Sequence, residues 1–286
     1  MAFIYSPKTW TGPHFQEIFS EAIFSNKTLD KNLVRVIEGI KSEQYVTSLT
    51  GAPVVQPYTV TPSTPLGGLT FSDTLIKPVK QMVHDRFDMN DFLATRFNSD
   101  MASGAARMES NEFLSAVITY ITPRISNAIE ASFWSNIVAK LVTATNIDVT
   151  GIVLNSGNIV AEIGKIYTAL PDEVKEEGKD ATIYAPKAVR SMILQANLDQ
   201  VYRDKFTVNG DAIAYLGVPV EFVPLPANTL TAGAKMDYVF GTDLLSDQGS
   251  IEVNKVSNES DLLFYKAVFT MDAAVCIPSQ KVLYKA

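Results

Sequence analysis

The sequence predicts an α+β fold, and three observations support this class. Apolar residues recur at every third or fourth position from 110 to 141, which is typical of one long helix. Short helical and strand patterns then alternate from 150 to 235, and the residues from 236 to 286 carry mostly strand patterns. Before the long helix, an apolar segment from 34 to 80 has the composition of extended chain.

The overall composition is that of an ordered protein without the charge needed for avid nucleic-acid binding. Of 286 residues, 47% are hydrophobic and 19% are charged, so a sizeable core is expected. The formal net charge of -7 argues against non-specific nucleic-acid binding, although such a protein can still enclose nucleic acid. The single cysteine, Cys276, and the lack of a signal-peptide pattern or of an apolar run near ~20 residues lead us to expect an intracellular origin.

The first element that we expect is a short amphipathic helix from 14 to 24. After it, the chain from Glu43 to Ile76 contains neither Lys nor Arg, and its charge is limited to Glu43 and Asp73. Thr and Val favour extended backbone, and the prolines of this segment forbid a helix across its middle. These prolines are Pro57, Pro62 and Pro65.

This extended segment is too long for an ordinary connection and too apolar for a disordered linker. We therefore predict a two-stranded arm with its tip between 54 and 65, whose apolar side chains are covered by another copy of the chain. The alternative is that these side chains pack within their own domain. The residues that we predict to contact a neighbouring subunit are Val54, Val55, Tyr58, Val60, Phe71 and Leu75.

The long helix from 110 to 141 should form a rod of roughly 45 Å. Pro123 lies inside it and should bend it, because proline removes a backbone donor. The segment from 80 to 89 that precedes it is consistent with either a strand or a helix. The expected apolar stripe is Leu114, Val117, Ile118, Ile121, Ile125, Ile129, Phe133, Ile137 and Leu141.

In the rest of the chain, short helices and strands are predicted from local patterns. Helices are expected from 158 to 170 and after Pro186, because proline is favoured at the first position of a helix. The charged stretch from 172 to 180 is expected to be a surface loop. The predicted strands are 182–185, 218–222, 237–240, 251–256, 262–270 and 273–284.

No motif in the sequence points to catalysis, so we predict no catalytic residue, no cofactor and no metal. The phosphate-binding loop and the dinucleotide-binding glycine turn are absent. The two histidines, His14 and His84, lie far apart and have no metal-ligand spacing. Cys276 lies in an apolar strand pattern, where a thiol is an inert core residue. An enzyme with an unfamiliar site remains an alternative, which would need paired titratable groups in a pocket.

The order of elements, together with one stretch of sequence, resembles a known family. Residues 215–226, YLGVPVEFVPLP, are similar to a strand of the family's apical domain, and 238–242, YVFGT, follows as it does there. An extended loop, a long bent helix, an α/β segment and returning strands occur in the same order. The chain thus resembles the major capsid protein of tailed bacteriophages, the Hong Kong 97-type fold that encapsulins share.

This resemblance implies a division of the chain into four parts. The extended loop of one subunit would lie over its neighbour, which would explain an apolar arm in an ordered protein. The implied parts are an N-terminal arm (1–33), the extended loop (34–80), a peripheral domain (81–149 and 236–286) with the spine helix (110–141), and an apical domain (150–235).

The implied function is that of a shell protein, not an enzyme. Many copies would form pentamers and hexamers and close into an icosahedral head, which encloses double-stranded DNA without reading its sequence. Portal, scaffold and decoration proteins are possible partners, and no membrane is involved. The protein would be part of the virion and would assemble in the cytoplasm of a host bacterium. The alternatives are an encapsulin shell or another structural component of a virion.

Overall fold

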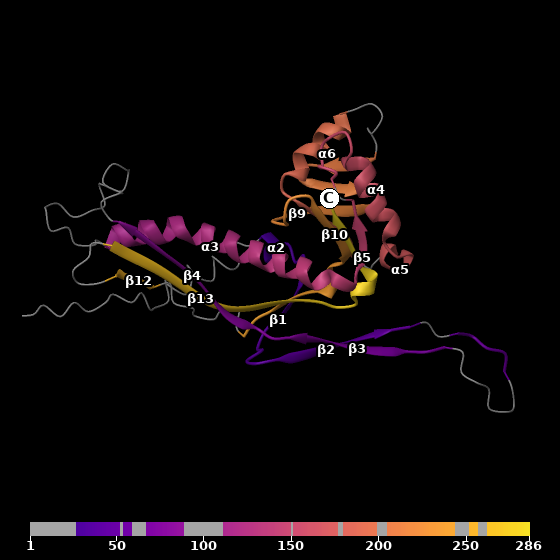
Figure 1. Cartoon of the computed structure of the whole chain (residues 1–286), viewed down its shortest axis with the longest axis horizontal. Helices are drawn as coiled ribbons and strands as arrows, with labels where there is room; N and C mark the ends of the chain where they lie inside the picture. Colours follow the sequence, from indigo (N-terminus) through magenta and orange to yellow (C-terminus); the bar gives the residue numbers. More distant parts are fainter. Residues whose placement is uncertain are drawn as a thin grey trace, which may run out of the picture.

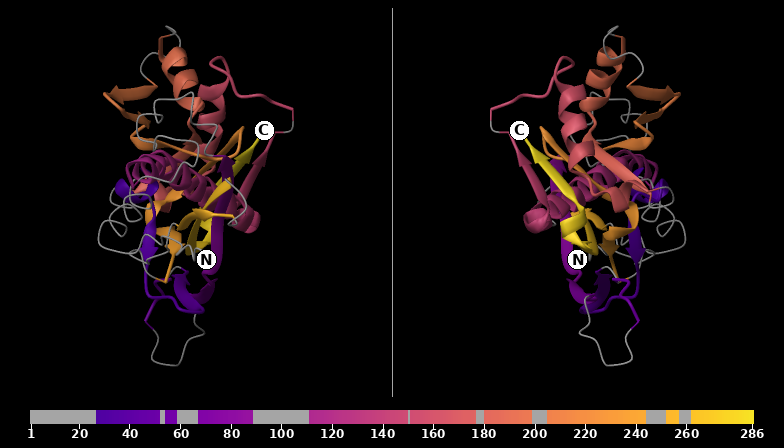
Figure 2. Two further views of the ribbon diagram at one scale, coloured as in Figure 1. Left: turned by 90° about the vertical axis from the view of Figure 1, so that its left-hand side faces the viewer. Right: turned by 90° about the vertical axis from the view of Figure 1, so that its right-hand side faces the viewer.

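The computed structural model describes residues 27–51, 54–58, 67–88, 111–149, 151–176, 180–198, 205–243, 252–256 and 262–286. It confirms the α+β class. A long helix and a five-stranded sheet run along the molecule, and an α/β unit stands at one end (Figure 1). A two-stranded hairpin lies on the side of the molecule away from this unit (Figure 2). The helix expected from 14 to 24 lies outside the described residues.

The five-stranded sheet is built around one long strand, β13. It pairs with β4, β11 and β12 along its length, and all three are antiparallel to it. β1 extends the sheet by pairing in parallel with β11. The strands are β1 (Arg35–Ile37), β4 (Val79–Asp88), β11 (Tyr238–Gly241), β12 (Glu252–Lys255) and β13 (Leu262–Val275).

The long helix α3 (Asn111–Lys140) packs on one face of this sheet. At 1.5 Å per residue its 30 residues span about 45 Å, and the 14 residues of β13 span a similar length. Pro123 lies inside the helix, as predicted. Six of the predicted stripe residues are buried on α3, a seventh is buried in the following turn η3 (Leu141–Thr143), and the side chains of Leu114 and Val117 are not described. The buried ones are Ile118, Ile121, Ile125, Ile129, Phe133, Ile137 and Leu141.

A buried polar network fixes the first described helix, α2 (Lys27–Asp30), on α3. The Thr28 hydroxyl donates to Glu130 Oε1 at 2.5 Å and accepts from Trp134 Nε1 at 2.9 Å. The Thr28 amide also donates to the same carboxylate at 3.1 Å. Because all three side chains are buried, these bonds satisfy groups that would otherwise be costly to desolvate.

The α/β unit contains a seven-stranded sheet in the order β5-β14-β10-β6-β9-β8-β7. The helices α4 (Ile159–Ala169) and α6 (Val189–Leu198) contribute buried residues to its core, which is separate from the core under α3. β5 and β14, at one edge of the sheet, lie far in the sequence from the other five strands. The strands are β5 (Thr145–Asp148), β6 (Ala181–Pro186), β7 (Phe206–Asn209), β8 (Ala212–Tyr215), β9 (Val218–Val223), β10 (Thr229–Ala234) and β14 (Val282–Lys285).

The stretch that carries the family resemblance forms a tight hairpin in this sheet. Leu216 and Gly217 alone connect β8 to β9, and their φ angles are +48° and +87°. A two-residue connection with both φ positive matches the twist of the paired strands, and Gly217 adopts such a φ without steric cost.

The segment from 80 to 89, for which the sequence left strand and helix open, is the strand β4, because it pairs with β13 over ten residues. Two other sequence-based expectations differ from the structure in detail. The predicted boundary between the strands 262–270 and 273–284 is wrong. β13 runs unbroken to Val275, since its partner changes from β4 to β11 without a break, and η5 (Pro278–Gln280) then leads to β14. The loop predicted from 172 to 180 begins with a short helix, α5 (Asp172–Lys175).

No helix in the described ranges is both long enough and apolar enough to cross a membrane.

Candidate assembly surface

The hairpin predicted in the extended segment consists of β2 (Gln44–Thr50) and β3 (Thr70–Ile76), which pair only with each other in the described structure. Residues directly opposite one another in such a pair point to the same face. The pairs Tyr45–Leu75, Thr47–Asp73 and Leu49–Phe71 therefore share one face. The other face carries the even-numbered residues.

The even-numbered face of the hairpin is partly covered by the body of the protein. Ile76 is fully buried and packs with Val239, Ala274 and Cys276, and Val46 packs against this cluster. The Cys276 thiol is hydrogen-bonded to the hydroxyls of Ser48 and Thr74 on the hairpin, and burial raises its pKa. These contacts anchor the hairpin at its base, and Cys276 is a core residue, as expected.

The odd-numbered face is open, and we call its six residues the open face: Tyr45, Thr47, Leu49, Phe71, Asp73 and Leu75. All six are exposed. The exposed fractions of the four apolar side chains are 60% for Tyr45, 51% for Leu49, 71% for Phe71 and 40% for Leu75. Between them, Thr47 donates a hydrogen bond of 2.6 Å to Asp73.

This arrangement reverses the usual pattern of a two-stranded sheet. An antiparallel sheet normally turns its apolar residues to the core and its polar residues to water. Here the partly covered face carries Ser48, Ser72 and Thr74, and the open face carries two aromatic rings and two leucines. A contiguous exposed apolar patch of this kind marks an interaction site in an ordered protein.

The loop beyond the strands adds further exposed apolar side chains. Val54 is half exposed, and Val55 and Tyr58 are almost fully exposed. Val60, which we also predicted to contact a neighbour, lies outside the described residues.

The structure thus brings two of the predicted contact residues, Phe71 and Leu75, onto one surface with two residues that the sequence analysis missed. Tyr45 and Leu49 are the cross-strand partners of Leu75 and Phe71. Their signal in the sequence is the odd-numbered spacing on both strands, which becomes visible only when the pairing register is known. None of the five described candidates is buried against its own chain.

Comparison with known proteins identifies the architecture. No family model and no curated protein sequence matches the chain. Among solved structures, one from Mycobacterium phage Che8 has a TM-score of 0.56 at 13% identity, covering 99% of this chain and 93% of that one. The satellite phage P4 procapsid with size determination (Sid) protein has a TM-score of 0.61 at 10% identity, covering 99% and 92%. A virus-like particle from Pyrococcus furiosus has a TM-score of 0.54 at 8% identity, covering 96% and 100%.

The chain has the major capsid fold of tailed phages. The match covers nearly the whole of this chain and of those it resembles, so the capsid fold accounts for both sheets, α3 and the hairpin together. The TM-scores of 0.54–0.61 establish the capsid fold, and at identities of 8–13% they establish the fold alone.

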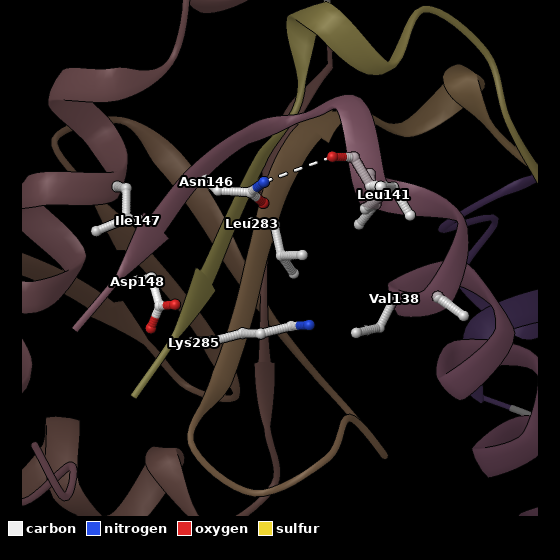
Figure 3. A pocket seen from close by; sticks show the side chains of 9 residues that line it. Val138, Leu141, Asn146, Ile147, Asp148, Leu283 and Lys285 are labelled. Atoms are coloured by element: carbon white, nitrogen blue, oxygen red, sulfur yellow. Dashed lines mark hydrogen bonds between the residues drawn. The ribbon is translucent and has the colours of Figure 1, made fainter. Parts of the chain in front are cut away.

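A pocket of about 270 Å³ lies where the end of α3 meets β5 and β14 of this capsid fold (Figure 3). Its lining is mostly aliphatic, with Asn146, Asp148 and Lys285 as the polar residues, and Asn146 donates to the Val142 carbonyl at 3.5 Å. The lining contains no histidine, cysteine or hydroxyl side chain. Within the described ranges, no group of three or more His, Cys, Asp or Glu side chains could hold a metal.

Proposed function

We propose that this chain is a major capsid protein, whose copies assemble through pentamers and hexamers into an icosahedral head around double-stranded DNA. The observation that carries the proposal is the open face of the hairpin. On a capsid fold, an anchored hairpin with an exposed apolar surface supports contact with a neighbouring subunit. In this proposal the hairpin of each copy lies over the next copy.

We assign the parts of the capsid fold as the resemblance implies. Residues 1–33 are the N-terminal arm, 34–80 the extended loop and 150–235 the apical domain, which would surround the five- and six-fold axes. Residues 81–149 and 236–286 are the peripheral domain. The seven-stranded sheet supports one refinement, that β5 and β14 belong structurally with the apical domain that they complete.

The proposal extends to partners and location. The protein would reside in the virion after assembly in the cytoplasm of a bacterial host. Portal, scaffold or decoration proteins would bind to the shell that it forms, and DNA would be enclosed without sequence-specific contacts. The formal charge of -7 supports enclosure over avid binding.

The encapsulin alternative is not favoured, because the similar structures described above come from phages and from a virus-like particle. The contents of the particle separate the two functions. Particles recovered from producing bacteria should protect double-stranded DNA from nuclease, whereas a packaged enzyme in place of DNA would favour the encapsulin.

Assembly of the full chain alone tests the proposal. The purified protein should form closed, uniform shells that are visible by negative-stain electron microscopy. A chain that remains monomeric or dimeric at high concentration contradicts the proposal. Open tubes or flat rings would instead indicate another structural component of a virion.

A further inference from the structure

The pocket at the end of α3 has an aliphatic floor. It lies between the last turn of α3, which continues into η3, and the strands β5 and β14 (Figure 3). Two of its lining residues, Leu141 and Leu283, are buried. Val138 lines it from α3, and Val142 is an exposed valine in its lining. The pocket can therefore remove a small aliphatic group from water.

The register of β5 and β14 places the polar residues on the same side of the sheet as this floor. In the parallel pair, Asn146 stands opposite Leu283. Two residues further along, Asp148 stands opposite Lys285. Because side chains alternate along a strand, these residues share one face, whereas Ile147 points to the other face and packs against the core of the α/β unit. A carboxylate and an ammonium group therefore come from neighbouring positions at the pocket.

The Lys285 side chain extends across the pocket toward Val138 (Figure 3). Lys285 is exposed, and among the residues that the structure describes its ammonium group has no salt-bridge partner. An ammonium group carries three hydrogen-bond donors and no acceptor. The pocket thus presents these donors to an anionic group that enters it.

Opposite charges beside an aliphatic floor match a zwitterion that carries an aliphatic side chain. A simple aliphatic carboxylate would pair with Lys285 but would bring a second negative charge close to Asp148. An alkylamine would pair with Asp148 and bring a second positive charge close to Lys285. An α-amino acid gives each group an opposite charge and adds no net charge. The volume of about 270 Å³ lies just below the usual range for drug-sized ligands, which suits a molecule as small as an amino acid.

We propose that this pocket binds a free aliphatic α-amino acid, such as leucine, in its zwitterionic form. The ligand carboxylate accepts hydrogen bonds from the Lys285 ammonium group. The ligand ammonium group donates to the Asp148 carboxylate. The aliphatic side chain of the ligand lies against Leu141, Leu283 and Val142.

Binding at this place should stabilise the folded chain. The ligand contacts the end of α3 together with two strands of the α/β unit, so it bridges two parts of the molecule. A ligand that binds only the folded state raises the midpoint of thermal unfolding. The pocket shares no residue with the open face of the hairpin, so this inference does not rest on the proposed function.

Three small molecules with the same branched carbon chain test the site on the purified full chain. L-Leucine carries both charges, isocaproate lacks the ammonium group and isoamylamine lacks the carboxylate. Saturation-transfer NMR should find that leucine binds about tenfold more tightly than either of the other two, because each of those loses one charged hydrogen bond. Equal affinities for the three molecules, or no binding of leucine up to about 10 mM, would overturn the proposal.

Substitutions at the two charged residues assign the contacts. Lys285→Gln should weaken the binding of leucine and isocaproate by about tenfold without weakening that of isoamylamine, and Asp148→Asn should weaken leucine and isoamylamine but not isocaproate. Lys205→Gln is the matched control, because it removes an exposed lysine of the same α/β unit that does not line the pocket. The site is wrong if Lys285→Gln and Lys205→Gln change leucine binding equally. Circular dichroism verifies folding, and the comparison of ligands on the wild-type chain decides if a variant is unfolded.

Discussion

Lys281 is a charged residue that the structure buries completely. Its ammonium group pairs with Asp237 and lies 6.0 Å from the ring centre of Tyr238. Burial lowers the pKa of Lys281, and the nearby Asp237 carboxylate opposes this shift. Gly233 makes room for the arrangement, because a Cβ there would overlap the Lys281 side chain. The pair fixes the connection between β13 and β14.

Removing the negative partner should destabilise the fold strongly. Asp237→Asn leaves the Lys281 ammonium buried without its counter-charge, so we expect a loss of about 3 kcal/mol in the free energy of unfolding, measured in urea. Asp211→Asn is the control, because Asp211 forms an exposed salt bridge with Arg190 and its loss should change stability little. Equal effects of the two substitutions would contradict a structural role for the buried pair.

Two buried tyrosines should make the folded protein less stable at alkaline pH. Burial raises the pKa of Tyr184 and of Tyr238 above the usual 10.0. The folded state then keeps protons that the unfolded state releases, so the contribution of these residues is complete below pH 10 and is lost as the pH rises further. The lowered pKa of Lys281 acts in the opposite direction. The unfolded state keeps the Lys281 proton to higher pH than the folded state, so this residue makes the stability rise with pH until the pH passes the ordinary value of 10.5.

Thermal unfolding from pH 8 to 12 should therefore show a falling midpoint above about pH 10 to 11. Tyr238→Phe should reduce the steepness of this fall, whatever its effect at neutral pH. An unchanged slope would contradict the assignment. Ultraviolet titration should also find tyrosines that ionise only when the chain unfolds.

At the scale of elements, the hairpin depends on close contact at its base. Gly241 of β11 lies against Ile76, and a Cβ at this position would overlap the Ile76 Cγ2 atom. Ile76 is in turn fully buried in the small cluster with Ala274 and Cys276. The body of the protein therefore sets the direction in which the hairpin leaves it.

Gly241→Ala should loosen this anchor. Overpacking of this kind costs about 1–3 kcal/mol, so we expect a lower free energy of unfolding and faster proteolysis within the hairpin. Gly68→Ala is a suitable control in the same segment, because a Cβ at Gly68 would meet nothing within 4 Å. Identical proteolysis rates for wild type and Gly241→Ala would show that the hairpin is anchored elsewhere.

At the scale of the whole molecule, the exposed hairpin should determine whether copies associate. Phe71→Asp places a charge on the open face, whereas Ser72→Asp places the same charge on the other face of the same strand. Losing a buried Phe contact is worth about 1.5–3 kcal/mol, which corresponds to about tenfold or more in the concentration needed for assembly. Sedimentation should show this shift for Phe71→Asp and not for Ser72→Asp; equal shifts would exclude the open face as the contact.

Local patterns predicted most elements of this fold, because their causes lie within a few residues. The apolar stripe from Ile118 to Ile137 required only helical periodicity, and Pro123 was placed correctly inside it. The candidate surface was predicted only in part. Phe71 and Leu75 stood out by their composition, but Tyr45 and Leu49 joined them through a pairing register that local sequence does not specify.

By itself, the sequence determined the α+β class, the long helix and the presence of an extended, cation-free hairpin, since periodicity, proline and composition act locally. The tertiary structure decided which face of that hairpin is covered, since this depends on Ile76 meeting β11 and β13 from distant parts of the chain. It also decided that β5 and β14 complete the seven-stranded sheet. Such long-range pairing follows from how all the elements pack together, and no single segment encodes it.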